Sequence, residues 1–332
     1  MLRPQRFNPG LRILLVAAAY YVTAQFGLWL SVVNDQVTPL WPPTGIGLAC
    51  LLLLGFRCWP GITLGAFLAN LPLGPNLVAV LAISAGNTLS LLCAYLLLRR
   101  VGFRIELDRL RDALALVFLG ACGAMLISAT MGTGALVLAG SLPASAFWST
   151  WLVWWAGDAL GVLVVLPVLL VAVRMRWRRR VAPLRLLEAL GLAAGIVGVF
   201  ALAKETATPL YFLAFPLLIW SALRFQLRGA APCALIMVTG AAIGAIRGIG
   251  PFAEIDLAAR MVTLQAFNAS ATLTALLLAA VTTQRNEAMR SVERAVEQLT
   301  QAVAALEPYS LLRDGLLDNV LRSRSAPERP IG

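Results

Sequence analysis

Asp158 is the residue with the clearest chemical potential, because it is a carboxylate inside an otherwise apolar run. No other charged residue lies between Trp148 and Val173. A run of that length and apolarity should cross a bilayer, where a carboxylate is costly unless it faces the interior of a helix bundle or a wet cavity. Asp158 therefore predicts a buried polar site, which either binds a ligand or belongs to a hydrogen-bonded network that only holds helices together.

Other polar residues lie at a similar predicted depth. Asn87 and Thr130, like Asp158, are about ten residues from the outer end of their apolar run, which is roughly 15 Å at the rise of an α-helix. Gln25 and Asn268 lie slightly shallower. Trp155 shares a helix face with Asp158 because it precedes Asp158 by three residues. We expect these side chains to meet in the outward half of the bundle.

The segment Trp41-Pro42-Pro43-Thr44-Gly45 is a second candidate part of the site. Prolines near the start of a span free backbone groups that a cavity or a neighbouring helix must satisfy. Gly45, Gly47, Gly61 and Gly65 permit close helix contacts, so the pattern suits a broken helix beside a cavity and also suits tight packing. The predicted ligand-binding or sensing residues are Asp158, Trp155, Asn87, Thr130, Trp41, Pro42, Pro43 and Gly45.

The composition is that of an integral membrane protein. The chain is 60% hydrophobic and 13% charged, with a mean hydropathy of +0.82. Its net charge of +11 comes from arginines in short loops between apolar runs, so no nucleic-acid partner is predicted and the lipid bilayer is the expected partner. The chain has no histidine, and its five cysteines form no CxxC motif. We therefore predict no metal site, no cofactor and no catalytic residue.

Ten apolar segments predict an all-α fold, a polytopic bundle of transmembrane helices. The segments are 11–33, 40–56, 59–73, 77–98, 112–140, 146–173, 184–203, 209–224, 229–246 and 261–282. The second and third can instead form a re-entrant hairpin over 40–73, which leaves eight full spans. The first is long enough to span and has no convincing cleavage site, so we interpret it as a helix rather than a signal peptide.

The basic residues predict that both ends of the chain lie in the cytoplasm. With the N-terminus inside, every lysine and arginine except Lys204, Arg247 and Arg260 falls in a cytoplasmic segment. Such a bias toward the short cytoplasmic loops sets the orientation of a membrane protein. The cluster between Arg174 and Arg180 is interpreted in the same way, as an anchor that also attracts anionic lipid.

Several blocks of the chain occur in a characteristic order. They are Leu40–Gly47, Leu53–Arg57, Trp59–Gly61, Leu64–Asn70, Gly86–Leu89, Ser128–Gly132 and Trp154–Asp158, followed by Gly161 and Pro167. In order and spacing they resemble the MASE1 family of membrane-associated sensor domains, over about residues 11–282. The resemblance implies a multi-pass receptor in the bacterial inner membrane that perceives a stimulus ahead of a cytoplasmic module of two-component or cyclic-di-GMP signalling. It implies no particular ligand and no catalytic residue.

Residues 284–307 are predicted to form a cytoplasmic signalling helix. Apolar residues recur there at alternating steps of three and four, which is the seam of a coiled coil. They are Met289, Val292, Val296, Leu299, Val303 and Leu306. We predict a homodimer through residues 289–306, and the alternative is a single helix that lies on the membrane or on the bundle. Pro308 is predicted to end the helix.

The chain is thus expected to have three parts: a MASE1-like transmembrane sensor domain (1–283), the signalling helix (284–307) and a tail (308–332). Residues 311–320 resemble the first helix of a PAS domain, and 323–332 are rich in proline, arginine and serine and are predicted to be disordered. No cyclase, phosphodiesterase or kinase motif follows. We therefore expect no enzyme activity from this chain. Two explanations of the absent effector stay open: the chain is truncated, or the signal passes to a separate effector or a transporter-like partner protein.

These observations favour a sensory or receptor domain. A secondary transporter or a channel-like protein can also combine ten spans, broken helices and a carboxylate at the midplane. No internal repeat is evident in the sequence, and substrate uptake into vesicles would distinguish transport from sensing. The sequence names neither the stimulus nor the partner.

Overall fold

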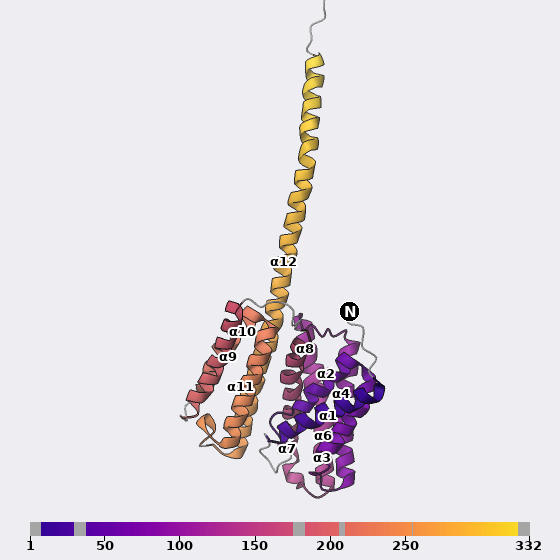
Figure 1. Ribbon diagram of the computed structural model, residues 1–332, viewed down its shortest axis with the longest axis vertical. Helices are drawn as coiled ribbons and strands as arrows, with labels where there is room; N and C mark the ends of the chain where they lie inside the picture. The colour runs from indigo at the N-terminus through magenta and orange to yellow at the C-terminus, as the bar shows by residue number, and fades with distance from the viewer. Residues whose placement is uncertain (1–7, 30–37, 175–182, 206–209, 254, 325–332) are drawn as a thin grey trace, which may run out of the picture. The chain divides into compact units, whose positions relative to one another are not determined.

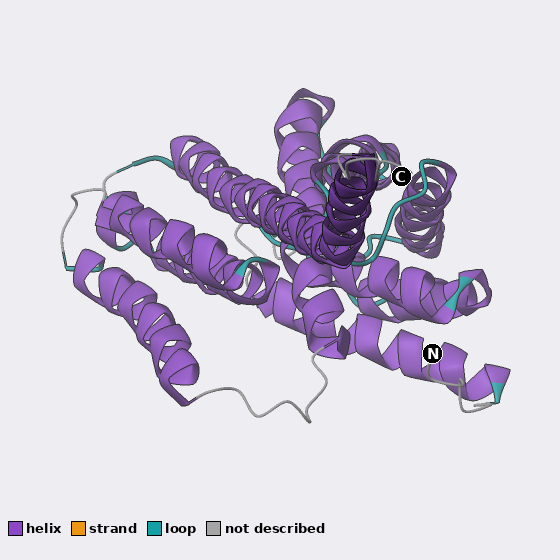
Figure 2. Cartoon of the chain, turned by 90° about the horizontal axis from the view of Figure 1, so that it is seen from above, coloured by secondary structure: helices purple, strands orange, loops and turns teal. Residues whose placement is uncertain are grey.

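The computed structural model of the chain describes residues 8–29, 38–174, 183–205, 210–253 and 255–324. These residues are almost entirely helical and include no strand (Figures 1 and 2). The predicted all-α class is therefore confirmed. The chain divides into two compact units, Met1–Thr283 and Gln284–Gly332, and each is described by itself.

Seven helical stretches in the described part of the chain are long and apolar enough to cross a membrane, as a polytopic bundle requires. They are Pro9–Trp29 (α1), Leu77–Arg100 (α4), Leu110–Leu138, Ala144–Val173, Pro183–Ala203 (α9), Leu227–Arg247 (α11) and Ala259–Val303. The third contains α5 (Leu110–Ala115), η2 (Leu116–Gly123) and α6 (Met125–Leu138), and the fourth contains η3 (Ala144–Ala146), α7 (Phe147–Leu160), η4 (Gly161–Val165) and most of α8 (Leu166–Arg174). The last belongs to α12 (Leu257–Arg324), and the 3-10 turn η6 (Gly250–Phe252) precedes it.

Three further helices are shorter than these spans. They are α2 (Pro42–Leu54) and α3 (Trp59–Asn70), joined by the turn η1 (Phe56–Cys58), and α10 (Ala214–Phe225), which follows η5 (Leu210–Leu213). With 13 and 12 residues, α2 and α3 are each about 20 Å long, less than a hydrocarbon core of about 30 Å. These lengths suit the expected hairpin over 40–73, while the number of full spans and the orientation stay predictions.

The two largest of four hydrophobic clusters among the described residues form the main cores of the larger unit. The first lies among α1 to α8 and includes the fully buried Leu48, Ile62 and Met125. The second lies among α9, α10, α11 and the first part of α12, and it includes Tyr211 and Phe267, whose ring centroids are 6.0 Å apart. Figure 1 shows α9, α10 and α11 side by side, next to the group that contains α1 to α8. The candidate site belongs to this first group of helices.

Large apolar side chains cover the outside of this unit. Leu138 is 90% exposed, Leu184 is 79% exposed and Val78 is 77% exposed. In water, so many exposed apolar side chains would drive association. In a bilayer they face lipid tails that are as apolar as leucine itself.

Glycines let α3 pack closely against α1. A Cβ on Gly61 would overlap the carbonyl oxygen of Ile13, and a Cβ on Gly65 would lie 2.7 Å from the Cβ of Tyr20. Because both positions lack a side chain, the two helices can approach almost backbone to backbone. Tight packing, one of the two interpretations left open for these glycines, therefore describes Gly61 and Gly65.

The helix that carries Asp158 changes its winding just after that residue. α7 ends at Leu160, and one turn of π-helix, η4, follows before α8 begins. The neighbouring span has a longer π-helical stretch, η2, between α5 and α6. Such π turns are rare and occur frequently at functional sites, where they re-aim the side chains around them.

The helix α12 has 68 residues and continues through Pro308 to Arg324. The predicted end at Pro308 is therefore wrong. A proline inside a helix removes one backbone hydrogen bond, and the leucine, alanine, glutamate and arginine residues around it favour the helix. The prediction of disorder is also wrong for Ser323 and Arg324, which belong to this helix, and residues 325–332 lie outside the described residues.

In the smaller unit, the apolar seam of α12 has no cover among the described residues. Its members Met289, Val292, Val296, Leu299 and Val303 are 55–66% exposed. The side chain of Leu306 lies outside the described side chains. Pairing of two chains through this seam stays a prediction.

Candidate ligand-binding site

Asp158 lies in the interior of the larger unit, near the end of α7. Its side chain is 1% exposed. Neither Oδ1 nor Oδ2 has a hydrogen-bond partner of ordinary geometry among the described residues, and the Ser128 hydroxyl and the Trp154 indole N–H are donors in its neighbourhood. A buried carboxylate without a partner is destabilising by several kcal/mol, so such a group in a native protein indicates an occupant or a chemical role.

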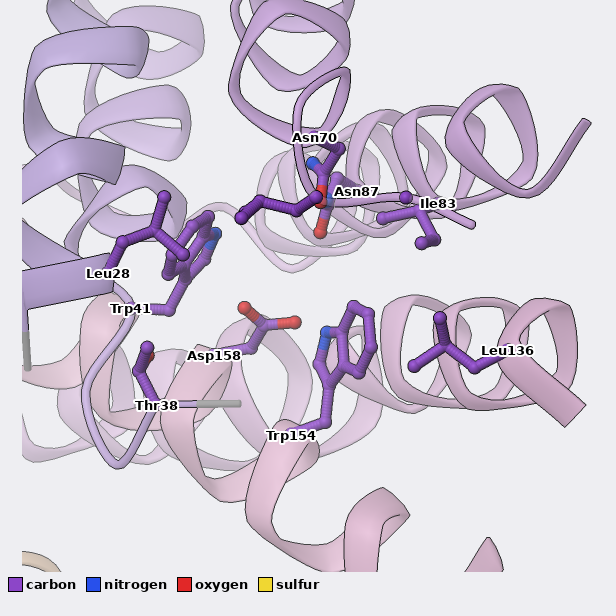
Figure 3. Close-up of a pocket in the computed structure, with 11 residues that line it drawn as sticks. Leu28, Thr38, Trp41, Asn70, Ile83, Asn87, Leu136, Trp154 and Asp158 are labelled. Carbon is purple, nitrogen blue, oxygen red and sulfur yellow. The ribbon is translucent and has the colours of Figure 1, made fainter. Parts of the chain in front are cut away.

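The Asp158 carboxylate borders a small cavity (Figure 3). The space that the centres of water molecules can occupy there is about 30 Å³, which is room for roughly two waters or a ligand of a few heavy atoms. Its polar and aromatic lining residues are Thr38, Trp41, Asn70, Asn87, Trp154 and Asp158. Leu28, Leu73, Ile83 and Leu136 supply most of the apolar wall. These lining residues thus come from α1, α3 and the turn after it, α4, α6, α7 and the segment ahead of α2.

Hydrogen bonds fix the turn that carries Asp158 to the start of α2. The Trp41 N–H donates to the Gly157 carbonyl oxygen at 3.0 Å. The Thr44 hydroxyl lies 2.7 Å from the Trp41 carbonyl oxygen and 2.9 Å from the Asp158 carbonyl oxygen. The segment around Trp41 and the turn of Asp158 are therefore held as one piece.

Glycines make this close approach sterically possible. A Cβ on Gly161 would overlap the carbonyl oxygen of Trp41, and a Cβ on Gly157 would overlap that of Thr38. On the facing helix, a Cβ on Gly45 would overlap the carbonyl oxygen of Gly161. The three glycines thus let α2 and the segment ahead of it lie directly on α7 and η4, which positions Asp158 at the cavity.

Two amide side chains lie across the cavity from Asp158 (Figure 3). The Asn87 Oδ1 atom accepts a hydrogen bond from the Ser128 hydroxyl of α6 at 2.8 Å. The Asn70 Nδ2 atom donates to the Ala66 carbonyl oxygen at 2.8 Å. Because these atoms are engaged, the groups that the two residues can still offer to a ligand are the Asn87 amide N–H and the Asn70 Oδ1.

Two indoles flank the Asp158 carboxylate, and the Trp154 indole nitrogen points toward it (Figure 3). Glycines on neighbouring helices leave room for both rings. A Cβ on Gly27 of α1 would lie 2.8 Å from the Trp41 ring, and a Cβ on Gly132 of α6 would lie 2.9 Å from the Cε2 atom of Trp154. The Trp41 ring therefore packs against the backbone of α1, and the Trp154 ring packs against the backbone of α6.

Trp155, which we expected in the site, lies outside the cavity. Its indole N–H donates to the Cys122 carbonyl oxygen in η2 at 2.8 Å, and its ring stacks on Trp151 with centroids 6.1 Å apart. Neighbouring residues of a helix point about 100° apart. Trp154 and Trp155 therefore lie on opposite flanks of Asp158, and Trp154 is the one that lines the cavity.

Thr130 also lies outside the cavity, contrary to expectation. It is exposed, and its hydroxyl accepts a hydrogen bond from the Trp151 indole at 3.0 Å. Ser128, two positions earlier and therefore about 200° around the helix, is the α6 residue that bonds to Asn87. A shared depth along two helices does not fix the direction in which a side chain points.

The remaining expected residues are placed in two ways. Asn87 and Trp41 line the cavity. Pro42 and Pro43 are buried in the first turn of α2, where their missing N–H groups leave no intrahelical bond unmade. Gly45 contacts η4, as described above. These three residues position the cavity and are not among its lining residues.

Eight lining residues were not expected from the sequence as site residues: Leu28, Thr38, Asn70, Leu73, Gly74, Ile83, Leu136 and Trp154. Trp154 precedes Asp158 by four residues. Residues four apart share a helix face, just as residues three apart do. Asn70 is the last residue of α3, and an amide at the end of an apolar helix was a usable signal. The other six carry no such signal.

A second group of buried polar side chains lies on one face of α12. Asn268 and Thr272 are 0% and 1% exposed, and within the described residues neither side chain has a hydrogen-bond partner. Gln265, one turn earlier, donates from Nε2 to the Pro39 carbonyl oxygen at 3.4 Å. Asn268, which we expected near Asp158, is not a lining residue of the cavity, but its face of α12 contacts the segment that carries Thr38 and Trp41.

The chemistry available in the cavity is that of binding. Asp158 is the single charged side chain among the described lining residues, and no lysine or arginine is among them. No group of three or more acidic or cysteine side chains suited to a metal ion occurs in the part of the chain that the structure describes. The cavity offers one carboxyl group, two indoles, two amides and one hydroxyl.

The fold and the cavity define a polytopic, all-α membrane protein with a polar site inside its bundle. A family model for MASE1 matches residues 12–286. The chain therefore belongs to the MASE1 family of bacterial membrane sensory domains, and it is a multi-pass protein of the inner membrane. Such domains are often found upstream of cyclase or kinase effectors.

The chain is also similar to a curated protein of Escherichia coli (strain K12), named "Probable diguanylate cyclase DgcE". The two are 27% identical over 168 residues, which is 48% of this chain. The similar region spans 14% of the length of the Escherichia coli protein. No solved structure matches the chain.

Proposed function

We propose that this domain perceives a small ligand in the Asp158 cavity and signals through α12. The observation that carries the proposal is the Asp158 carboxylate, which is buried beside a cavity without a partner. A polar network that only held helices together would satisfy its buried groups. Atoms of Asp108, Asp112 and Arg260 are also unsatisfied, but each of those groups has a partner through another atom. Asp158 differs because both of its oxygens lack one, as in a group that awaits a ligand.

The segment 38–41 offers a physical connection between the cavity and α12. Thr38 and Trp41 line the cavity, and Pro39 between them accepts the hydrogen bond from Gln265 of α12. A ligand that contacts Asp158 and Trp41 stabilises one position of this segment. If the ligand binds one position of this segment more tightly than the other, it shifts the equilibrium between them and with it the packing of α12.

The direction of signalling follows from the predicted orientation. With the N-terminus in the cytoplasm, α1 runs outward to Leu28 and α3 runs outward to Asn70, and both residues line the cavity. The ligand therefore reaches the cavity from the outer side of the membrane. The signal leaves on the cytoplasmic side, along α12.

The output is proposed to be a cytoplasmic effector of cyclic-di-GMP or two-component signalling. Similarity to a protein named as a probable diguanylate cyclase supports the first of these. The exposed seam between Met289 and Val303 suits a parallel homodimer. Dimerisation there would bring two effector modules together, whether they follow on the chain or belong to a partner protein.

The test is a fusion of this chain, after Glu307, to a diguanylate cyclase module. Cyclic-di-GMP is measured in cells across a panel of defined media, and we expect at least one medium to change the output several-fold. Asp158→Asn keeps the size of the side chain and removes its charge, so it should abolish that response. Asp256→Asn is the matched control, because Asp256 is exposed and caps the N-terminus of α12, a role that asparagine retains.

Two outcomes would overturn the proposal. A response that survives Asp158→Asn, Asp158→Ala and Asn87→Ala would mean that the cavity is structural and that sensing occurs elsewhere. Accumulation of a substrate in vesicles that contain the unfused chain, lost on Asp158→Asn, would favour a secondary transporter instead. Membrane levels of each variant are measured alongside, so that a failure of insertion is recognised.

A further inference from the structure

We infer that the ligand of the Asp158 cavity is a small organic cation of the ammonium class, with an N–H donor and no more than a few heavy atoms. This inference rests on the proposed function, because it takes the same cavity as the binding site. It adds the chemical class of the ligand to that function.

Charge is the first argument. The Asp158 oxygens are buried and without partners, and among the described residues that line the cavity none carries a positive charge. Charge-assisted hydrogen bonds from N⁺–H to a carboxylate are about twice as strong as neutral ones. Without a cation, a carboxyl group buried in this way takes up a proton rather than staying charged, whereas an N⁺–H donor pairs with its charged form. A cation is therefore the occupant that the carboxylate favours most.

The aromatic walls are the second argument. Trp41 and Trp154 flank the carboxylate (Figure 3), and Trp154 turns the nitrogen edge of its indole toward it. A tryptophan ring face attracts a cation more strongly than that of tyrosine or phenylalanine, so a cation held at Asp158 gains from an indole ring that it contacts. The Asn70 Oδ1, whose Nδ2 is bonded to Ala66, is a further acceptor for a ligand N–H.

The size of the cavity limits the ligand. About 30 Å³ of space for water centres accommodates roughly two waters. Ammonium, methylammonium and ethylammonium fit this space and keep an N–H group for Asp158. Tetramethylammonium is bulkier and has no N–H group, so we expect it to bind poorly.

The same lining residues argue against a metal cation. Hard metal ions such as calcium take six to eight oxygen ligands. Here the described lining residues include one carboxylate, and their remaining polar side chains are two amides, two indoles and the hydroxyl of Thr38. The Thr38 hydroxyl already donates to the Leu40 carbonyl oxygen at 2.9 Å.

The experiment uses the full chain, purified in lipid nanodiscs. Methylammonium chloride and ethylammonium chloride are titrated at constant ionic strength, with sodium, potassium and tetramethylammonium chloride as comparisons. The readouts are tryptophan fluorescence and the temperature of thermal unfolding. We expect the two alkylammonium ions to change both readouts saturably, and the three comparison ions to produce no saturable change.

Paired variants assign the effect to this cavity. Asp158→Asn should remove the saturable change, and Asp256→Asn should retain it. Trp154→Phe should weaken binding about 2- to 30-fold, the range expected for part of a cation–π contact. Trp148→Phe is its control, because Trp148 is 69% exposed and does not line the cavity. If Asp158→Asn does not fold, the comparison of Trp154→Phe with Trp148→Phe still decides the question.

Each opposite result would overturn the inference. The ligand class is wrong if sodium acts like methylammonium, if no alkylammonium ion produces a saturable change, or if binding is unaffected by both Asp158→Asn and Trp154→Phe. The effector fusion separates this failure from that of the proposed function. An Asp158-dependent output without alkylammonium binding leaves the sensor intact and rejects the ligand class. Alkylammonium binding without any change in output supports the ligand class and rejects the proposed sensor function.

Discussion

The Gln265 side chain of α12 lies 3.4 Å from the Pro39 carbonyl oxygen and donates to it. This contact joins the last helix of the membrane unit to the segment whose residues Thr38 and Trp41 line the cavity. At that length the hydrogen bond is longer than the usual 2.7–3.2 Å. A weak bond between two well-packed elements is one that a small movement of the segment can make or break.

Replacing Gln265 should separate ligand binding from output. Gln265→Leu removes the hydrogen bond to Pro39 and leaves every lining residue in place. We expect binding to change by less than about threefold and the output of the cyclase fusion to lose at least half its response, since one hydrogen bond contributes about 0.5–1.5 kcal/mol. The control is Thr263→Leu, an exposed position on the same helix. An unchanged response in Gln265→Leu would remove this contact from the signalling path.

Gly161 should be intolerant of any side chain. Its Cβ would overlap the Trp41 carbonyl oxygen and lie close to the Thr44 hydroxyl, so Gly161→Ala forces the segment ahead of α2 away from α7. Overpacking of this kind typically destabilises by about 1–3 kcal/mol, and we expect a lower temperature of thermal unfolding in detergent. Gly134→Ala is the control, because a Cβ there would meet no atom within 4 Å. Equal stability of the two variants would contradict the close contact.

Reporter fusions should place both chain ends in the cytoplasm. We expect a fusion after Gly140, between α6 and η3, to be active as a periplasmic reporter, and a fusion after Arg290 to be active as a cytoplasmic one. The physical reason is the bias of lysine and arginine toward one side. A periplasmic result after Arg290 would invert the model and place the cavity on the cytoplasmic side.

Crosslinking should detect a parallel dimer through α12. In a background without the five native cysteines, a cysteine at Val296, in the seam, should form a disulfide across a dimer in membranes. A cysteine at Glu297 should crosslink several-fold less, because it points about 100° away. Equal crosslinking at both positions would show that this part of the chain does not pair through the predicted seam.

The helices were predictable from the sequence because hydrophobicity decides which stretches enter a bilayer. The ends of most spans fall within a few residues of the apolar segments, as in α4, expected over 77–98 and observed over Leu77–Arg100. The last span is the exception, since α12 continues past residue 282 to Arg324. The end of the signalling helix was not predictable from Pro308. A proline weakens a helix locally, and the preference of the flanking residues decides whether the helix continues.

The site was predictable only in part. A lone carboxylate in an apolar run must be buried in protein, so Asp158 could be identified from its surroundings in the chain. The direction of its neighbours could not, because Trp154 and Trp155 are both within one turn of Asp158, and only the packing of α7 against α6 and η2 decides which indole lines the cavity. The predicted place of Thr130 in the cavity differs from the observed one for the same reason, since depth along a helix does not fix the direction of a side chain.

The open glycines of α9 have a practical consequence for work on this membrane domain. A Cβ on Gly191 or Gly198 would meet no atom within 4 Å, and neither residue has a backbone conformation that requires glycine. Alanine at such a helical position raises stability by about 0.4–1 kcal/mol, chiefly because it restricts the unfolded chain. The double variant Gly191→Ala, Gly198→Ala leaves the cavity untouched and is therefore a suitable starting point for crystallisation or electron cryomicroscopy.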